Sequence, residues 1–188
     1  MKKIYATIAL LCFSAITIMA QTKLPPLDKS PLDQSYCPDR YPSLRLDSTK
    51  NSGPLIARVI YSRPQKNGRV IFGGLVPYDK VWRLGANEAT EIDFFTGVKI
   101  AGKSIDAGRY TLYAIPEKDK WTIILNKETD IWGDFGYDEK KDVLRTDVQV
   151  QTQPDITEAL SMVFQKSATG SDLIMVWDNV KVSLPVVY

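Results

Sequence analysis

The stretch GRYTLYAIPEKDKWTIILNK, residues 108–127, decides the fold class. Two runs with a period of two stand on either side of Pro116. The apolar residues that recur at this period are Tyr110, Leu112 and Ala114 in the first run and Trp121, Ile123 and Leu125 in the second. Such alternation places one set of side chains on one face of a β-strand. Because Ile124 is apolar as well, the second run predicts a strand that is covered on both faces.

Short runs of the same kind continue on both sides of this stretch. They cover residues 55–62, 69–72, 90–94, 98–100, 104–105, 144–150, 162–164, 173–177 and 180–184. Asp178 and Asn179 between the last two runs predict an antiparallel hairpin, and only residues 153–160 could hold a helical turn. About nine or ten short strands, with no repeat period and no long helix, predict an all-β fold. We expect a single-domain antiparallel β-sandwich, jelly-roll or immunoglobulin-like, over residues 55–188.

The first twenty residues have the layout of a secretory signal peptide. Lys2 and Lys3 precede an apolar run over residues 4–19, and Ala20 offers a small residue at a cleavage site. This run is shorter than the roughly 20 residues that a membrane-spanning helix needs. We therefore expect residues 1–20 to be removed on export to the periplasm or the extracellular space, leaving no transmembrane span. Residues 21–54 carry six prolines, which is typical of an extended leader.

The composition excludes several chemistries. The 188 residues include no histidine, which excludes Ser-His-Asp triads, Cys–His pairs and the common zinc sites. Loss of Lys2 and Lys3 reduces the basic residues from 24 to 22, equal to the 22 acidic ones, so no net positive field would attract nucleic acid. Loss of Cys12 leaves Cys37 alone. We expect Cys37 to be an unpaired thiol on the surface, with an intermolecular link as the alternative.

The segment VPYDKVWRLGANEATE, residues 76–91, interrupts the strand pattern and is the main candidate site. Its chemistry-bearing residues are Trp82, Arg83, Asn87, Glu88 and Glu91. A glycan site needs such a set, because an aromatic face suits the sugar ring and planar polar groups suit its hydroxyls. The alternative is structural: Arg83 would pair with one of the two carboxylates while the indole ring caps the core. Gly85 could supply a corner with positive φ.

Two further patterns allow weaker hypotheses. Arg63, Lys66 and Arg69 form a basic turn that could receive an anion, or that simply keeps a sheet edge soluble. Glu88 and Glu91 could be the carboxylate pair of a glycosidase, but residues three apart fit neither of the usual geometries securely.

A second loop is both acidic and aromatic. Asp130, Asp134 and Asp138 could offer oxygens to calcium, although their spacing matches no calcium loop that we can name. Trp132 and Tyr137 would equally serve a sugar-binding surface. The sequence therefore predicts no definite metal site, no cofactor and no catalytic residue.

Three blocks of the sequence resemble a known family. They are YSRPQKNGRVIFGGLVPYDKVWRLGANEATEIDF (residues 61–94), the stretch 108–127 quoted above and WDNVKVSLPV (residues 177–186). Together they resemble the secreted bacterial family catalogued as domain of unknown function 2911, common in Bacteroidetes, over roughly residues 55–187. Asp79 stands where that family would have glycine. The resemblance implies a one-domain exported protein and brings no activity, cofactor or catalytic residue.

Two functions remain open at this point. The first is a non-enzymatic binding or structural module of the envelope or extracellular space, which would touch a glycan or another small polar ligand. Its candidate ligand-binding residues are Trp82, Arg83, Asn87, Glu88, Glu91, Arg63 and Trp132. The second is a hydrolase that uses carboxylates without histidine. A surface for a partner protein is a further possibility, and it would show as an exposed apolar patch.

Overall fold

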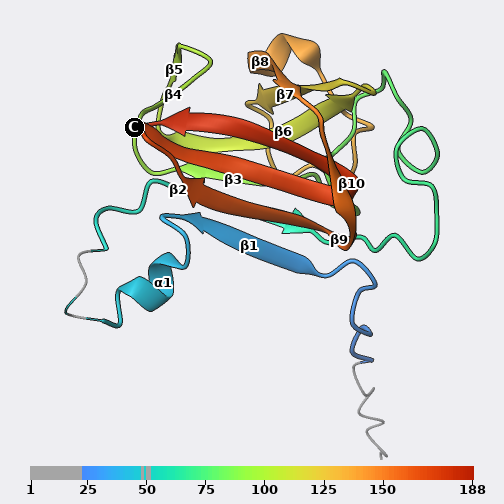
Figure 1. Ribbon diagram of the computed structural model, residues 1–188, viewed down its shortest axis with the longest axis horizontal. Helices are drawn as coiled ribbons and strands as arrows, with labels where there is room; N and C mark the ends of the chain where they lie inside the picture. Colours follow the sequence, from blue (N-terminus) through green and yellow to red (C-terminus); the bar gives the residue numbers. More distant parts are fainter. Residues whose placement is uncertain (1–22, 48, 50–51) are drawn as a thin grey trace, which may run out of the picture.

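The computed structural model describes residues 23–47, 49 and 52–188, and these residues form two antiparallel β-sheets (Figure 1). In chain order the elements are β1 (Leu32–Cys37), α1 (Tyr41–Leu44), β2 (Ala57–Ser62), β3 (Glu91–Phe94), β4 (Val98–Ile100), β5 (Lys103–Ile105), β6 (Gly108–Pro116), β7 (Lys120–Asn126), η1 (Glu139–Lys141, a 3₁₀ turn), β8 (Asp142–Gln149), β9 (Gln151–Lys166) and β10 (Gly170–Val187). One sheet has the order β1-β2-β3-β6-β7-β8, and the other has the order β5-β4-β10-β9. The predicted β-sandwich is confirmed.

Strand β7 lies between β6 and β8 and has both faces covered. Trp121, Ile123 and Leu125 are at most 1% exposed and belong to the main core. Ile124, which points to the opposite face, packs with Tyr113 in a second, smaller cluster. The alternation in residues 108–127 therefore predicted both the strand and its two-sided burial.

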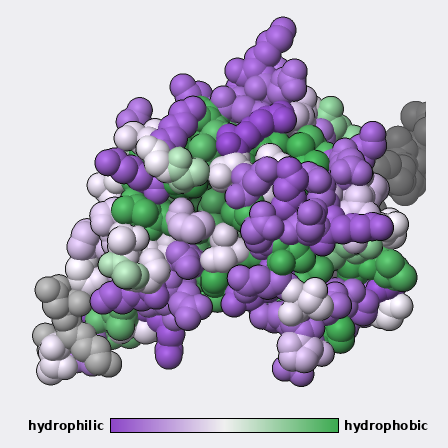
Figure 2. All heavy atoms as spheres, turned by 45° about the horizontal axis from the view of Figure 1, so that its top comes forward, coloured by the Kyte–Doolittle hydropathy of each residue, from purple (hydrophilic) through white to green (hydrophobic). Residues whose placement is uncertain are grey.

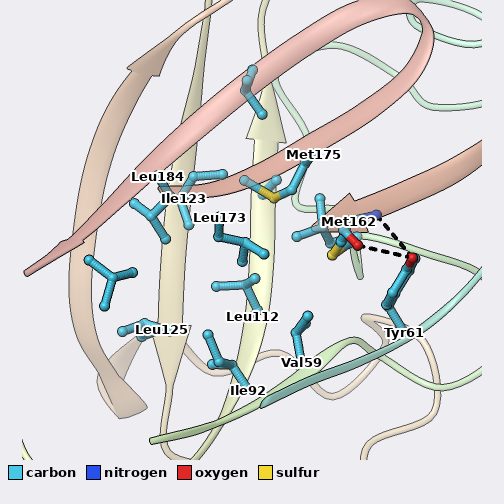
Figure 3. Packing of buried hydrophobic residues seen from close by; sticks show 14 of the residues in the cluster. Val59, Tyr61, Ile92, Leu112, Ile123, Leu125, Met162, Leu173, Met175 and Leu184 are labelled. Atoms are coloured by element: carbon cyan, nitrogen blue, oxygen red, sulfur yellow. Dashed lines mark hydrogen bonds between the residues drawn. The ribbon is translucent and has the colours of Figure 1, made fainter. Parts of the chain in front are cut away.

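The main core fills the space between the two sheets (Figure 3). Leu112 and Ile123 come from the six-stranded sheet, and Leu173 and Met175 come from the four-stranded sheet. Fully burying one such side chain stabilises the fold by about 1.5–3 kcal/mol. Tyr61 adds a polar link, because its hydroxyl donates to the carbonyl of Met162 (3.3 Å) and accepts from the Met162 N–H (3.0 Å).

The middle of the expected leader belongs to the sheet. Residues 32–37 form β1, which pairs antiparallel with β2 along its whole length. Cys37 was predicted on the surface, but it is 0% exposed, and its Sγ lies 3.5 Å from the hydroxyl of Tyr188. The surface position predicted for Cys37 was wrong, because pairing of β1 with β2 places this residue in the core. Residues 32–37 are extended, but as a strand of the sheet. The predicted signal peptide lies outside the described residues.

Three local predictions also failed. Residues 153–160, where the sequence allowed a helical turn, are part of strand β9. Asp178 does not turn the chain into a hairpin: it has a φ of 57° and marks a register irregularity inside the continuous strand β10, whose hairpin partner is β9. Residues 69–72 form turns rather than a strand, with a single bridge between Phe72 and Val76. Within the described residues no helix is long and apolar enough to cross a membrane.

Candidate functional site

The segment between β2 and β3, residues 63–90, is the long green loop on the right of Figure 1 and is built mostly of turns. Trp82 ties its middle to the sheet: the Trp82 N–H donates to the carbonyl of Ala114 (2.7 Å), and the Trp82 carbonyl accepts from the Ala114 N–H (3.0 Å). The N–H of Thr90 donates to the carbonyl of Arg83 (3.0 Å). Leu84, with a φ of 55°, takes the left-handed conformation that we expected of Gly85. These contacts fix the backbone on both sides of Arg83.

The ring of Trp82 is 6% exposed and lies in a cluster of four aromatic rings with Phe72, Trp121 and Trp177. It stacks on Trp177 with 6.0 Å between centroids and an interplanar angle of 20°, and it meets Trp121 edge-on at 5.8 Å. Its indole N–H donates to the carbonyl of Gly85 (3.1 Å). Trp82 therefore caps the core, and little of its face is free for a sugar ring.

A pocket of about 240 Å³, called here the Arg83 pocket, opens above this aromatic cluster. Its lining residues come from five separated segments: Ser30, Pro64, Arg69, Leu75, Val76, Pro77, Val81, Trp82, Arg83, Gly85, Ala86, Asp134 and Trp177. The Nε of Arg83 is buried and has no hydrogen-bond partner among the described residues. No ion pair of Arg83 with another described residue occurs. A buried donor without an acceptor costs about 1–3 kcal/mol, so this guanidinium is not explained by the protein's own packing.

The basic turn contributes only one of its three cations to this pocket. Arg63 is used structurally, since its guanidinium donates to the carbonyl of Leu160 (3.1 Å), to Asp33 (3.0 Å) and to the hydroxyl of Ser161 (2.9 Å). The ammonium of Lys66 donates to Asp178 (2.7 Å) and to the carbonyl of Arg69 (2.8 Å). The guanidinium of Arg69 donates to the carbonyls of Lys66 and Gln65 and lines the pocket. Arg63 and Lys66 thus attach the turn to the rest of the fold, and Arg69 lines the pocket.

Asp134 brings a carboxylate to the same pocket. Its carbonyl accepts from the Tyr137 N–H (3.1 Å). Its carboxylate makes no hydrogen bond or ion pair with any described residue, and it is not paired with Arg83 or Arg69. The Arg83 pocket is therefore lined by two arginines and one aspartate that form no ion pair with one another.

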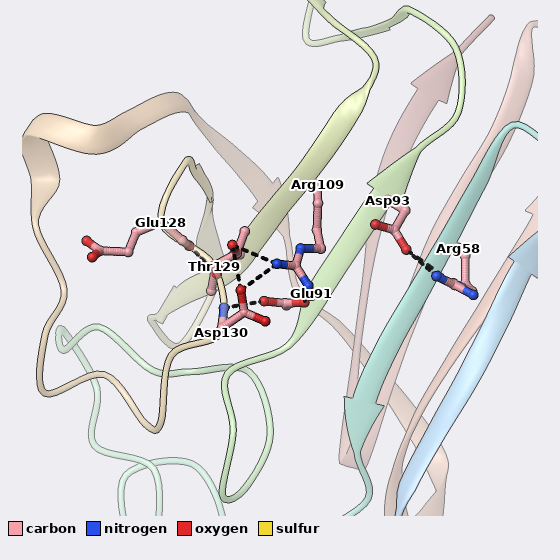
Figure 4. A network of polar contacts seen from close by, with 8 residues as sticks. Arg58, Glu91, Asp93, Arg109, Glu128, Thr129 and Asp130 are labelled. Carbon is pink, nitrogen blue, oxygen red and sulfur yellow. Dashed lines mark hydrogen bonds and ion pairs between the residues drawn. The ribbon is translucent and has the colours of Figure 1, made fainter.

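The two glutamates of the loop line a different, smaller pocket of about 160 Å³, called here the Glu91 pocket. Both oxygens of Glu91 are engaged: Oε1 accepts from the Asp130 N–H (2.6 Å), and Oε2 lies 3.4 Å from Nη1 of Arg109 (Figure 4). Arg109 also pairs with Asp130 and donates to the hydroxyl of Thr129 (3.0 Å). The charge of Glu91 and then the hydrogen bond from Arg109 to Asp130 raise the pKa of Arg109. Both carboxylates thus share one guanidinium within the chain.

The remaining predicted residues join two loops through their backbones. The carbonyl of Asn87, at a φ of 58°, accepts from the Gly133 N–H (2.9 Å), and Glu88 forms a β-bridge with Trp132. Asn87 and Glu88 thus hold the acidic loop against the Arg83 loop. The Trp132 ring is 61% exposed and does have a free face.

The three aspartates considered for calcium do three different things. Asp130 pairs with Arg109, Asp134 lines the Arg83 pocket, and the carboxylate of Asp138 accepts from the Lys140 N–H (3.0 Å) to cap η1. No three metal-ligating residues gather at one point in the described part of the chain.

The structure distributes the predicted ligand-binding residues over two pockets. It brings Trp82 and Arg83 to one pocket and Glu88 and Glu91 to another, and Arg63 lines neither of the two. Asp134 completes the Arg83 pocket from about fifty positions further along the chain, and no local sequence signal links it to the arginine.

These features define a two-sheet antiparallel β-sandwich that carries a small pocket with two arginines above an aromatic core cluster. The family model of the proteins of unknown function DUF2911 matches residues 46–186. The chain therefore belongs to this family, and the resemblance of its sequence blocks is confirmed. None of the curated proteins and none of the solved structures matches the chain.

Proposed function

We propose that this protein is a non-enzymatic binding module and that the Arg83 pocket holds the acidic group of a small polar ligand. The observation that carries this proposal is the buried Nε of Arg83, which has no acceptor among the described residues. A carboxylate or phosphate would supply the acceptor and the opposite charge, and arginine binds both with paired hydrogen bonds. Arg69 adds a second positive charge at the same pocket.

The size of the pocket limits the ligand. Its volume of about 240 Å³ lies below the roughly 300–1,000 Å³ of sites for drug-sized molecules. A monosaccharide, an organic acid or an amino acid is the right scale. In the glycan version of this proposal the ligand is a single acidic sugar residue, held by its carboxylate rather than by stacking on Trp82.

The alternative of a carboxylate hydrolase has less support. Such an enzyme needs one carboxyl group with a raised pKa and a second one free to react. Both oxygens of Glu91 already have partners, and Glu88 is exposed. The face of the molecule in Figure 2 is mostly hydrophilic and its apolar residues lie in separate patches, so this face does not favour a protein-docking surface.

A binding screen tests the proposal. Acetate, phosphate, glucuronate, gluconate and the neutral sugar glucose would be titrated against residues 21–188, with thermal shift and calorimetry as readouts. We expect at least one acid to bind the wild-type protein and to lose tenfold or more in affinity in Arg83→Gln. Arg45→Gln, which changes an exposed arginine outside the pocket, is the matched control. Equal binding by wild type and Arg83→Gln would contradict the proposal.

We also propose that the protein works outside the cytoplasm. The support is the sequence pattern of Lys2, Lys3 and the apolar run that ends before Gln21. Cell fractionation followed by N-terminal sequencing of the mature protein tests it. A periplasmic or secreted chain that begins at Gln21 is the expected result, and a cytoplasmic chain that retains residues 1–20 would contradict it.

A further inference from the structure

The Arg83 pocket is unusual in this molecule because its opposite charges do not meet. Elsewhere the chain pairs arginines with carboxylates closely: Arg58 lies 2.7 Å from Asp93, and Arg145 lies 2.7 Å from Asp142. Asp134 and Arg83 line one pocket of about 240 Å³ and remain unpaired among the described residues. Opposite charges that line one pocket attract each other, so the absence of an ion pair between these two side chains needs a cause.

The backbone holds them apart. Arg83 is fixed by the bonds of its neighbour Trp82 to Ala114 and by the Thr90 N–H on its own carbonyl. Asp134 follows Gly133, whose N–H donates to the carbonyl of Asn87 (2.9 Å), and its own carbonyl closes the turn to Tyr137. The two side chains therefore face one space from loops that are anchored separately.

We propose that the ligand of the Arg83 pocket is dipolar: an anionic group lies against Arg83 and Arg69, and an ammonium group lies against Asp134. This inference rests on the proposed function and narrows it to zwitterions, such as an amino acid or an amino sugar acid. A simple anion would be repelled by the Asp134 carboxylate, and a simple amine would be repelled by the two guanidinium groups. A dipolar ligand satisfies the charges at both ends.

Two matched sets of probes test the inference and separate its two sources. The first set is L-alanine, propionate and ethylamine, and the second is glucosaminate, gluconate and glucosamine. Each set contains a zwitterion, the anion alone and the amine alone at similar size. We expect the zwitterion of at least one set to bind about tenfold tighter than either of its halves. The set that binds identifies the source as amino acid or amino sugar.

The Asp134→Asn variant tests whether Asp134 binds the ammonium group of the ligand. This change keeps the size of the side chain and removes a charge that makes no hydrogen bond or ion pair with other described residues, so the fold should persist. We expect about tenfold weaker binding of the zwitterion and unchanged or tighter binding of the anion alone. Asp155→Asn, at an exposed aspartate outside the pocket, is the matched control.

The outcomes are distinguishable. If the anion binds as tightly as the zwitterion, and Asp134→Asn changes neither, the dipolar inference fails while the anion-binding proposal stands. If Arg83→Gln leaves binding of every probe intact, or if no probe binds at all, both fail.

Discussion

The molecule places arginine near carboxylate in two contrasting regions. At the Glu91 pocket, Arg109 meets Glu91 and Asp130, and each of these three charges has a partner within the chain. At the Arg83 pocket, the guanidinium Nε is buried without an acceptor among the described residues, and the nearby Asp134 carboxylate is unpaired as well. The ion pairs explain the arrangement of Arg109 in the first region. The proposed ligand would supply the acceptor that Arg83 lacks in the second region, and that difference underlies our proposal.

The largest expected effect belongs to Trp82, which serves both as core and as pocket wall. Trp82→Ala removes a ring that is 6% exposed and packs on three other aromatic rings, so we expect a loss of about 3–5 kcal/mol in the free energy of unfolding. Urea unfolding measures it. Any accompanying loss of ligand binding would reflect this damage. Trp132→Ala, at an exposed ring, should change stability by less than about 0.5 kcal/mol; a similar loss in both variants would contradict the assignment of Trp82 to the core.

Glu91→Gln probes the region whose charges are paired. The variant loses the ion pair with the half-exposed Arg109 and weakens the bond from the Asp130 N–H, so we expect a loss of about 1 kcal/mol in unfolding free energy. Ligand affinity at the Arg83 pocket should not change. Glu88→Gln is the control, because the Glu88 carboxylate makes no hydrogen bond or ion pair with the described residues. Loss of ligand binding in Glu91→Gln with normal stability would move the site to the Glu91 pocket.

Ionisation of the Tyr113 phenol should make the stability of the fold depend on pH in the alkaline range. Burial, and next the negative charge of Asp134, raise the pKa of Tyr113 to about 12 from 10.0. Below pH 10 the phenol is neutral in both the folded and the unfolded protein, and its contribution to stability is fully present. Between pH 10 and 12 the phenol ionises only in the unfolded protein, so this contribution is lost as the pH rises. We expect roughly 1 kcal/mol of loss, which Tyr113→Phe should reduce. Denaturation at stepped pH measures it, and an identical pH profile in the variant would contradict it.

Arg83→Gln should have the smallest effect on stability and the largest on binding. The wild-type guanidinium is buried at Nε without a partner, so its removal should leave the free energy of unfolding within about 0.5 kcal/mol of wild type, or raise it. Thermal unfolding without ligand measures this. A loss above about 2 kcal/mol would show that Arg83 has a structural partner and would weaken the contrast between the two regions.

The fold was predictable wherever a strand carries its own alternating pattern. Strands β6 and β7 follow directly from residues 108–127. Strand β1 could not be predicted, because the flanking Pro31 and Pro38 and the polar residues around it suggest a leader, and only pairing with β2 fixes its conformation. Residues 153–160 have no strand pattern of their own, and pairing with β10 extends β9 through them. Tertiary contacts override local preference in both cases.

The candidate site was predictable only in part. Arg83 stood out because its loop interrupts the strand pattern and gathers charged and aromatic groups. The sequence left open whether Trp82 presents a face or caps the core, because its place in a four-ring cluster depends on Phe72, Trp121 and Trp177, which are distant in sequence. Asp134 reaches the pocket through backbone bonds between two loops, a relation that no spacing along one chain reveals.

The most direct test follows the Nε–H of Arg83 itself. In a ¹H–¹⁵N spectrum of residues 21–188, this resonance would be titrated with glucosaminate and with L-alanine, using the Nε–H of Arg109 as an internal reference. We predict that the Arg83 resonance moves to saturation with at least one probe while the Arg109 resonance stays in place. An Arg83 signal that does not move while the protein binds the probe, or that moves no more than the Arg109 signal, would contradict the central claim.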